Sequence, residues 1–151
     1  MMKDENWYEL VVGDRSRSGG QWDIWEATYS PVGPDGYPLP IWDKRTGAID
    51  QDVAEYWREH YDLRHILETQ WTTLGPKLAH KLHVYIGDMD SYYLNMGVRM
   101  LDEFLAERAV DPPFTGEVIF EPMAPHCWGP RGSELFEKIA DHLEQYGPGG
   151  D

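Results

Sequence analysis

The chain has 151 residues, of which 41% are hydrophobic, and this is enough apolar surface for one folded domain over residues 1–151. Its formal net charge is −14, which repels phosphate backbones and anionic lipid, so we expect neither a nucleic acid nor a membrane partner. The single cysteine, Cys127, excludes a disulfide within these residues. The start, MMKDENWYEL, lacks the apolar core of a signal peptide, so by default we expect a cytoplasmic protein.

Residues 1–50 are rich in glycine, proline, aspartate and tryptophan and show no sustained helical period. GDRSRSGGQ predicts a loop because adjacent glycines and serines favour turns, and WDIWEATY predicts a short strand or one helical turn. Four prolines in SPVGPDGYPLPIWDKRTGAID exclude a long helix. We therefore predict a loop-rich segment, similar to a lid or an insertion, that packs through its tryptophans.

Residues 51–76 carry the first helical pattern. Asp50 precedes one amphipathic stretch and Asp62 a second, and an aspartate at such a position can accept hydrogen bonds from the free N–H groups of a helix start. Gly75-Pro76 is expected to end the second helix.

Residues 77–147 follow the order strand, helix, strand, helix. An apolar run over 81–87 predicts a strand that is apolar on both faces, which is typical of a parallel sheet covered by helices on both sides. An apolar stripe predicts a helix over about 92–108, and EVIFEP predicts a second strand over 117–122. A last helix begins near Ser133, and four of its apolar side chains are expected inside: Leu135, Phe136, Ile139 and Leu143.

The predicted fold class is therefore α/β, with a small parallel sheet flanked by helices and preceded by the loop-rich segment rich in tryptophan and proline. Two parallel strands leave bare edges and cannot cover a normal core. We therefore expect a homo-oligomer, or a strand from the N-terminal half that widens the sheet.

Chemically useful side chains follow both predicted strands. Asp88 and Asp90 come directly after the first strand, and His126 lies in the loop after the second. In open α/β sheets reactive groups gather beyond the carboxyl ends of the strands. An aspartate and a histidine at adjacent strand ends form a pair in which the carboxylate orients the imidazole that acts as base. A set of Asp88, Asp90, Glu121 and His126 would also suit a divalent metal, which stays an alternative.

KLHVYIGDMDSYYLNMGVRMLDEFL followed by APHCW resembles the C-terminal part of α/β-hydrolase esterases of the enterochelin-esterase-like group. The resemblance covers about residues 77–146. It implies that Asp90 is the acid and His126 the base of a catalytic triad. It also implies a serine nucleophile on a sharp turn and a backbone oxyanion hole, both from a preceding part of the fold.

This sequence departs from that family because it has no G-x-S-x-G motif. Ser16 and Ser18, in a glycine-flanked loop, are the candidate substitute nucleophiles, although a flexible polar loop is the favoured explanation for both. Cys127 beside His126 is expected to be a packed thiol. Three tryptophans are candidate substrate-binding residues, with loop packing as the simpler explanation: Trp22, Trp25 and Trp128.

The functional hypothesis from sequence is a carboxylic-ester hydrolase acting on a small-molecule ester, with Asp90 and His126 as its identified catalytic residues and no cofactor or resident metal. Two alternatives stay open. One is a metal-assisted hydrolase. The other is a non-catalytic, truncated hydrolase half that serves as a binding or assembly module.

Overall fold

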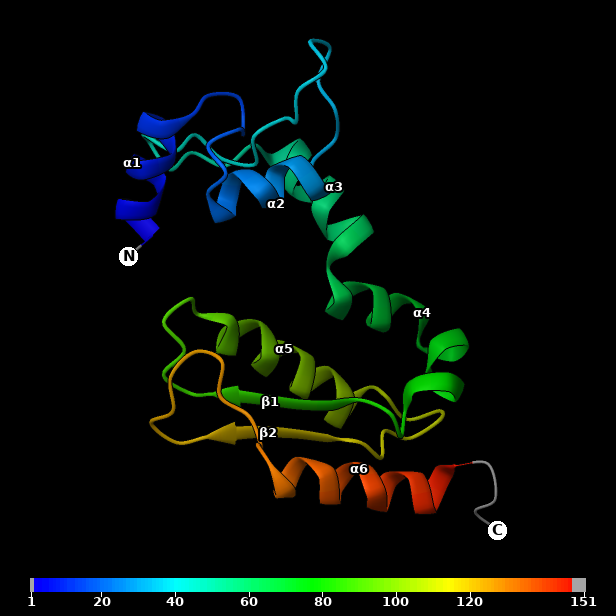
Figure 1. Ribbon diagram of the computed structural model, residues 1–151. Helices are drawn as coiled ribbons and strands as arrows, with labels where there is room; N and C mark the ends of the chain where they lie inside the picture. The colour runs from blue at the N-terminus through cyan, green and yellow to red at the C-terminus, as the bar shows by residue number, and fades with distance from the viewer. Residues whose placement is uncertain (1, 148–151) are drawn as a thin grey trace. The chain divides into compact units, whose positions relative to one another are not determined.

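A computed structural model describes residues 2–147, in which six helices and one small parallel sheet follow the order α1, α2, α3, α4, β1, α5, β2, α6 (Figure 1). The chain divides into two compact units, with the boundary between Leu74 and Gly75. Sequence analysis treated residues 1–151 as one domain, whereas each of the two units has its own internal packing. No helix of the described residues is long and apolar enough to cross a membrane.

The first unit contains two helices within residues 1–50, where the sequence predicted a loop-rich segment with only a short strand or one helical turn at WDIWEATY. They are α1 (Met2–Val12) and α2 (Gln21–Tyr29). Gly20 at the start of α2 has no side chain with which to cap the helix. The cap comes instead from α1, because Glu9 Oε1 accepts the N–H groups of Trp22 at 2.9 Å and Asp23 at 3.3 Å. A cap from a distant helix leaves no local signal in the sequence.

A buried charge cluster holds the segment after α2 against these helices. Lys44 Nζ lies 2.7 Å from Glu9 Oε2 and 3.8 Å from Glu26 Oε2, and it also pairs with Asp23. All three carboxylates are buried. Burial raises the pKa of Glu26, and the Ser16 hydroxyl and the Lys44 charge offset this only in part. Removing Lys44 would leave buried carboxylates without a cation, so this lysine anchors the proline-rich segment.

The helices α3 (Gln51–Tyr61) and α4 (Leu63–Leu78) confirm the predicted helical stretch. Asp50 Oδ1 accepts hydrogen bonds from the N–H groups of residues 52 and 53, both at 3.1 Å, as its position predicted. Asp62 Oδ1 likewise accepts the N–H of His65 at 3.1 Å. The expected end at Gly75-Pro76 is wrong, because helical bonding continues past the proline, which removes only its own donor.

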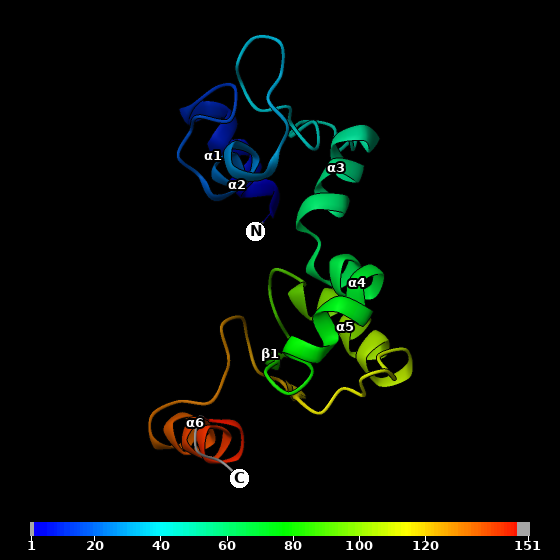
Figure 2. The same cartoon turned by 90° about the vertical axis from the view of Figure 1, so that its right-hand side faces the viewer.

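The second unit has the predicted strand–helix–strand–helix order. β1 (His83–Gly87) and β2 (Glu117–Glu121) pair in parallel, with His83 opposite Glu117 and Gly87 opposite Glu121. α5 (Leu94–Glu107) and α6 (Ser133–Tyr146) lie on opposite sides of this sheet (Figures 1 and 2). The N-terminal half adds no strand, because the described residues before His83 form only isolated β-bridges.

The core of this unit lies on the α5 side of the sheet. Phe104 and Leu105 of α5 are each 2% exposed, and Ile86 of β1 is also buried. α6 has no buried residue, so the expectation that its apolar side lies inside is wrong. Phe136 is 71% exposed and Leu143 59%. The reason is the width of the sheet, since two strands do not present enough surface to cover a four-turn helix.

Phe104→Ala should lower the free energy of unfolding by about 3–5 kcal/mol, because it empties a fully packed site. Phe136→Ala removes the same side chain from an exposed position and should change that free energy by no more than about 0.5 kcal/mol. Denaturant unfolding of both variants measures the difference. Equal losses for the two variants would show that α6 is buried in solution and that this description of the core is wrong.

Candidate active site at the strand ends

Three hydrogen bonds join the loops that leave β1 and β2. The N–H of Asp88 donates to Glu121 O at 3.0 Å, and the N–H of Met89 donates to Ala124 O at 3.1 Å. In the other direction the N–H of Met123 donates to Asp88 Oδ1 at 2.6 Å. Asp88 therefore has a structural role, because its carboxylate fixes the second loop against the first.

Gly87 is the residue that lets these loops come so close. A Cβ atom at this position would lie 2.2 Å from Ala124 O and 2.4 Å from Pro125 O, and both are backbone atoms that cannot move aside independently. Ala124 and Pro125 directly precede His126. The glycine that ends the first strand thus determines where the histidine of the second loop stands.

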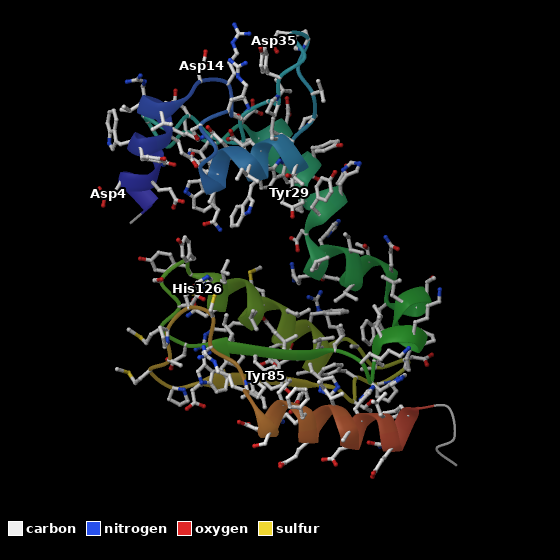
Figure 3. The ribbon with its side chains drawn as sticks, in the orientation of Figure 1. Asp4, Asp14, Tyr29, Asp35, Tyr85 and His126 are labelled. Carbon is white, nitrogen blue, oxygen red and sulfur yellow. The ribbon has the colours of Figure 1, made fainter. Side chains whose placement is uncertain are left out.

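Asp90 and His126 are in direct contact, which confirms the proximity that sequence analysis predicted. His126 Nδ1 lies 2.8 Å from Asp90 Oδ2, and Asp90 Oδ1 accepts the N–H of Tyr92 at 2.7 Å. The Asp90 side chain is fully buried and that of His126 is 34% exposed. His126 lies on the loop after β2 (Figure 3). A buried carboxylate therefore holds one ring nitrogen while the ring itself reaches the surface.

The hydrogen bonds keep Asp90 ionised. Burial alone would raise the pKa of its carboxyl group, but the hydrogen bonds from His126 and from the N–H of Tyr92 outweigh burial and hold this pKa below its ordinary value. An ionised carboxylate accepts a hydrogen bond from an N–H at Nδ1, which places the free electron pair of the neutral ring on Nε2. The pair thus has the arrangement required of a base and its orienting acid.

Besides Asp90, the imidazole contacts an aromatic side chain of its own unit. The ring of Tyr92 packs against it, with centroids 4.7 Å apart at 55°. Among the described residues of 75–147, none forms a hydrogen bond with Nε2. The reactive nitrogen therefore has no nucleophilic partner in the unit that carries the pair. Sequence analysis did not single out Tyr92. A signal for it existed, because the side chain of an aspartate such as Asp90 often accepts a hydrogen bond from the backbone N–H two residues later in a turn.

Backbone strain gathers in these loops. Tyr93, Met123 and Cys127 all have φ between 60° and 63°, a left-handed conformation that residues other than glycine seldom adopt. Tyr93 is also the residue directly before α5, so Asp90 lies outside the helix-capping position. Strain of this kind persists where surrounding contacts enforce it, and it is concentrated at functional sites.

Two further sequence expectations at the strand ends are not met. Cys127 is exposed, so the prediction of a packed thiol is wrong. The described residues include no group of three or more histidine, cysteine, aspartate or glutamate side chains arranged to hold a metal ion. The carboxylate of Asp88 instead accepts a hydrogen bond from the backbone N–H of Met123. The described residues therefore provide no ligand set for the metal-assisted alternative.

The candidate nucleophiles belong to the first unit. Ser16 Oγ donates to Glu26 Oε2 at 2.7 Å, and Ser18 Oγ accepts the N–H of Gly20 at 3.0 Å. Ser16 borders a cavity of about 360 Å³, and no histidine lines it. Within the first unit both hydroxyls therefore have structural partners and neither has an imidazole as base.

The candidate substrate-binding tryptophans divide between the units. Trp22 and Trp25 meet edge to face with centroids 4.8 Å apart, and Trp22 meets Trp42 in the same way at 5.1 Å. These contacts fit the simpler explanation, loop packing. Trp128 is partly exposed in the loop of His126, two residues beyond it. Of the three tryptophans, Trp128 is the one that is close in sequence to His126.

Gly87→Ala should separate the two loops, because its Cβ has no space beside Ala124 and Pro125. We expect a loss of about 1–3 kcal/mol or more in the free energy of unfolding, together with a change in the NMR signals of His126. The matched control is Gly97→Ala in α5, where nothing lies within 4 Å of the new Cβ. This control should raise stability by about 0.5–1 kcal/mol. Similar results for both variants would contradict the role given to Gly87.

Asp90→Asn should destabilise the fold by about 1–3 kcal/mol at neutral pH, because it removes a buried charged hydrogen-bond acceptor. The folded-state pKa of Asp90 is depressed, so its contribution is present above the ordinary value of 3.8 and is lost as the pH falls through the lower folded-state value. The difference from wild type should therefore shrink below pH 3.8 in urea unfolding. Asp141→Asn, an exposed position on α6, is the control. A difference that stays constant with pH would be the contrary result.

No protein-family model, curated protein or solved structure matches this chain. The resemblance to the α/β-hydrolase esterases therefore rests on the motifs around residues 83–104 and 124–128.

Proposed function

We propose that this chain is a carboxylic-ester hydrolase of α/β-hydrolase type in which His126 is the general base and Asp90 orients it. The single observation that supports this is the 2.8 Å hydrogen bond between a buried Asp90 carboxylate and Nδ1 of a ring that is 34% exposed. The pair also follows two adjacent parallel strands, where reactive groups of α/β folds gather.

In the proposed reaction Nε2 of His126 takes a proton from the attacking hydroxyl group. Asp90 stabilises the imidazolium ion that forms, because its carboxylate faces Nδ1. The imidazolium then returns the proton to the leaving alcohol as the ester bond breaks. General acid–base assistance of this kind contributes about 100- to 10,000-fold to rate.

The attacking hydroxyl group belongs to an unidentified serine or to a water molecule. Water attack forms no covalent intermediate, so it gives up part of the rate enhancement of serine hydrolases. We therefore propose slow hydrolysis of activated esters. Exposed apolar side chains near the pair, Met89, Tyr93 and Met123, favour substrates with an apolar acyl or alcohol group.

A second proposal is a binding or assembly module that does no chemistry itself. It is favoured by the unpartnered Nε2 within its unit and by the exposed apolar face of α6. Self-association through that face or through the open edges of the sheet would cover it, and the mass of the protein in solution would show it.

Hydrolysis of p-nitrophenyl butyrate by the whole chain tests the catalytic proposal. His126→Gln should lower kcat/KM by at least about 100-fold, since it removes the general base. His60→Gln is the matched control, because His60 is an exposed histidine of α3 whose Nδ1 meets the backbone oxygen of Tyr56, and it should leave the rate unchanged.

Labelling by a fluorophosphonate, with the modified peptide identified by mass spectrometry, separates the two nucleophiles. A labelled serine that disappears in His126→Gln identifies a serine hydrolase. Hydrolysis without labelling identifies attack by water. No hydrolysis of any p-nitrophenyl ester by the folded protein would refute the enzyme and leave the binding module.

A further inference from the structure

A second cavity lies on the face of the sheet opposite the core. It has a volume of about 410 Å³ and separates β1 from α6. Its floor contains His83 and Tyr85 of β1, and Tyr85 is labelled in Figure 3. Its wall is apolar and comes from three side chains of α6: Leu135, Ile139 and Leu143. A volume of this size falls within the usual range of small-molecule sites.

The charged groups of this cleft are all basic. Lys81, Lys138 and His142 line it together with His83, and no aspartate or glutamate does. This is an unusual local composition for a chain with 27 acidic and 13 basic side chains. The cleft is therefore a basic, apolar-walled site on an acidic protein.

Part of this positive charge is already paired. Glu117 accepts hydrogen bonds from Lys138 Nζ at 3.2 Å and from the Tyr85 hydroxyl, and its Oε1 lies 3.1 Å from His83 Nδ1. Glu117 thus neutralises the side of the cleft nearest β2. Among the described residues no carboxylate pairs with Lys81 Nζ or with the ring of His142. These two groups are the ones left to bind an anion.

The surroundings of His142 are positive on more than one side. Its ring centroid lies 5.1 Å from that of His83 and 5.9 Å from that of His80, and Tyr146 packs at 4.9 Å. Burial lowers the pKa of His142, and the nearby His83, His80 and Lys81 lower it further. An anion placed beside this ring would relieve that repulsion.

We propose that the cleft between β1 and α6 binds an apolar carboxylic acid as its carboxylate. The hydrocarbon part lies against Leu135, Ile139 and Leu143, and the carboxylate meets Lys81 and His142. An apolar wall with few basic groups at one side selects this chemistry over a neutral or cationic ligand. Such a ligand would also cover apolar surface of α6 that the two-stranded sheet leaves exposed.

This site is independent of the proposed catalysis. His83 begins β1, whereas Asp90 lies beyond the end of that strand at Gly87. Loss of His126 should therefore leave carboxylate binding unchanged, and loss of Lys81 should leave ester hydrolysis unchanged. The two proposals can fail separately.

Octanoate is the probe, with octylamine as the charge-reversed control of equal chain length. Calorimetry and NMR on the whole chain should show octanoate binding, with octylamine at least 10-fold weaker. Lys81→Gln and His142→Gln should each weaken octanoate binding by at least 5-fold, whereas Lys77→Gln, an exposed lysine of α4, should not. The probe pair needs no variant, so it decides the matter even if a variant fails to fold.

Binding should also depend on pH. A bound carboxylate favours the protonated form of His142, so octanoate affinity should rise from pH 8 to pH 6, and NMR should show the pKa of His142 rising on binding. His142→Gln should flatten this dependence.

Equal binding of octanoate and octylamine would overturn the proposal, because it would mean apolar adsorption alone. So would an absence of octanoate binding at millimolar concentration. A third contrary result is a stable dimer that Ile139→Asp dissociates and octanoate does not affect, since the cleft would then be an interface between copies of this chain.

Discussion

A hydrogen bond between a buried carboxylate and a partly exposed imidazole, 36 residues apart in the sequence, is the interaction on which the proposed function depends. It exists because two loops leave adjacent parallel strands and are tied together by backbone hydrogen bonds next to Gly87. The contact buries the charged carboxylate of Asp90, which is unfavourable by itself. The hydrogen bonds from His126 and from the N–H of Tyr92 offset this cost. The left-handed backbone of neighbouring residues indicates that these contacts hold the loops in place against local strain.

The narrow sheet explains most of the surface chemistry of the second unit. Two strands are enough to align Asp90 with His126, because this needs only one pair of adjacent strand ends. They are too few to bury the apolar side of α6, whose Phe136 and Leu143 are exposed. The same shortage opens the basic cleft between α6 and β1. The contact between Asp90 and His126 and the exposed surface of α6 thus both reflect the two-stranded sheet, and a ligand, a second copy or another strand would each reduce that exposure.

Sequence patterns predicted the features that depend on local chemistry. The apolar run over residues 81–87 predicted β1, Asp50 predicted the start of α3, and the positions of Asp90 and His126 after the two strands predicted their contact. The predictions were wrong where residues of another element determine the local structure or its burial. α2 begins at a glycine because Glu9 supplies its cap from another helix. The apolar stripe of α6 predicted burial, but burial depends on the number of strands beside it, which no periodicity reveals. Likewise Ser16 showed no sign in sequence that Glu26 would bind its hydroxyl group.

The central claim is that Asp90 fixes the protonation pattern of His126. The most direct test is the tautomer of the neutral His126 ring, measured by ¹H–¹⁵N NMR correlations of the imidazole in wild type and in Asp90→Asn. We expect a proton on Nδ1 and a free electron pair on Nε2 in wild type, and loss of that preference in the variant, because an amide can also present a donor to Nδ1. A wild-type ring protonated on Nε2, or the same mixture of tautomers in both proteins, would contradict it.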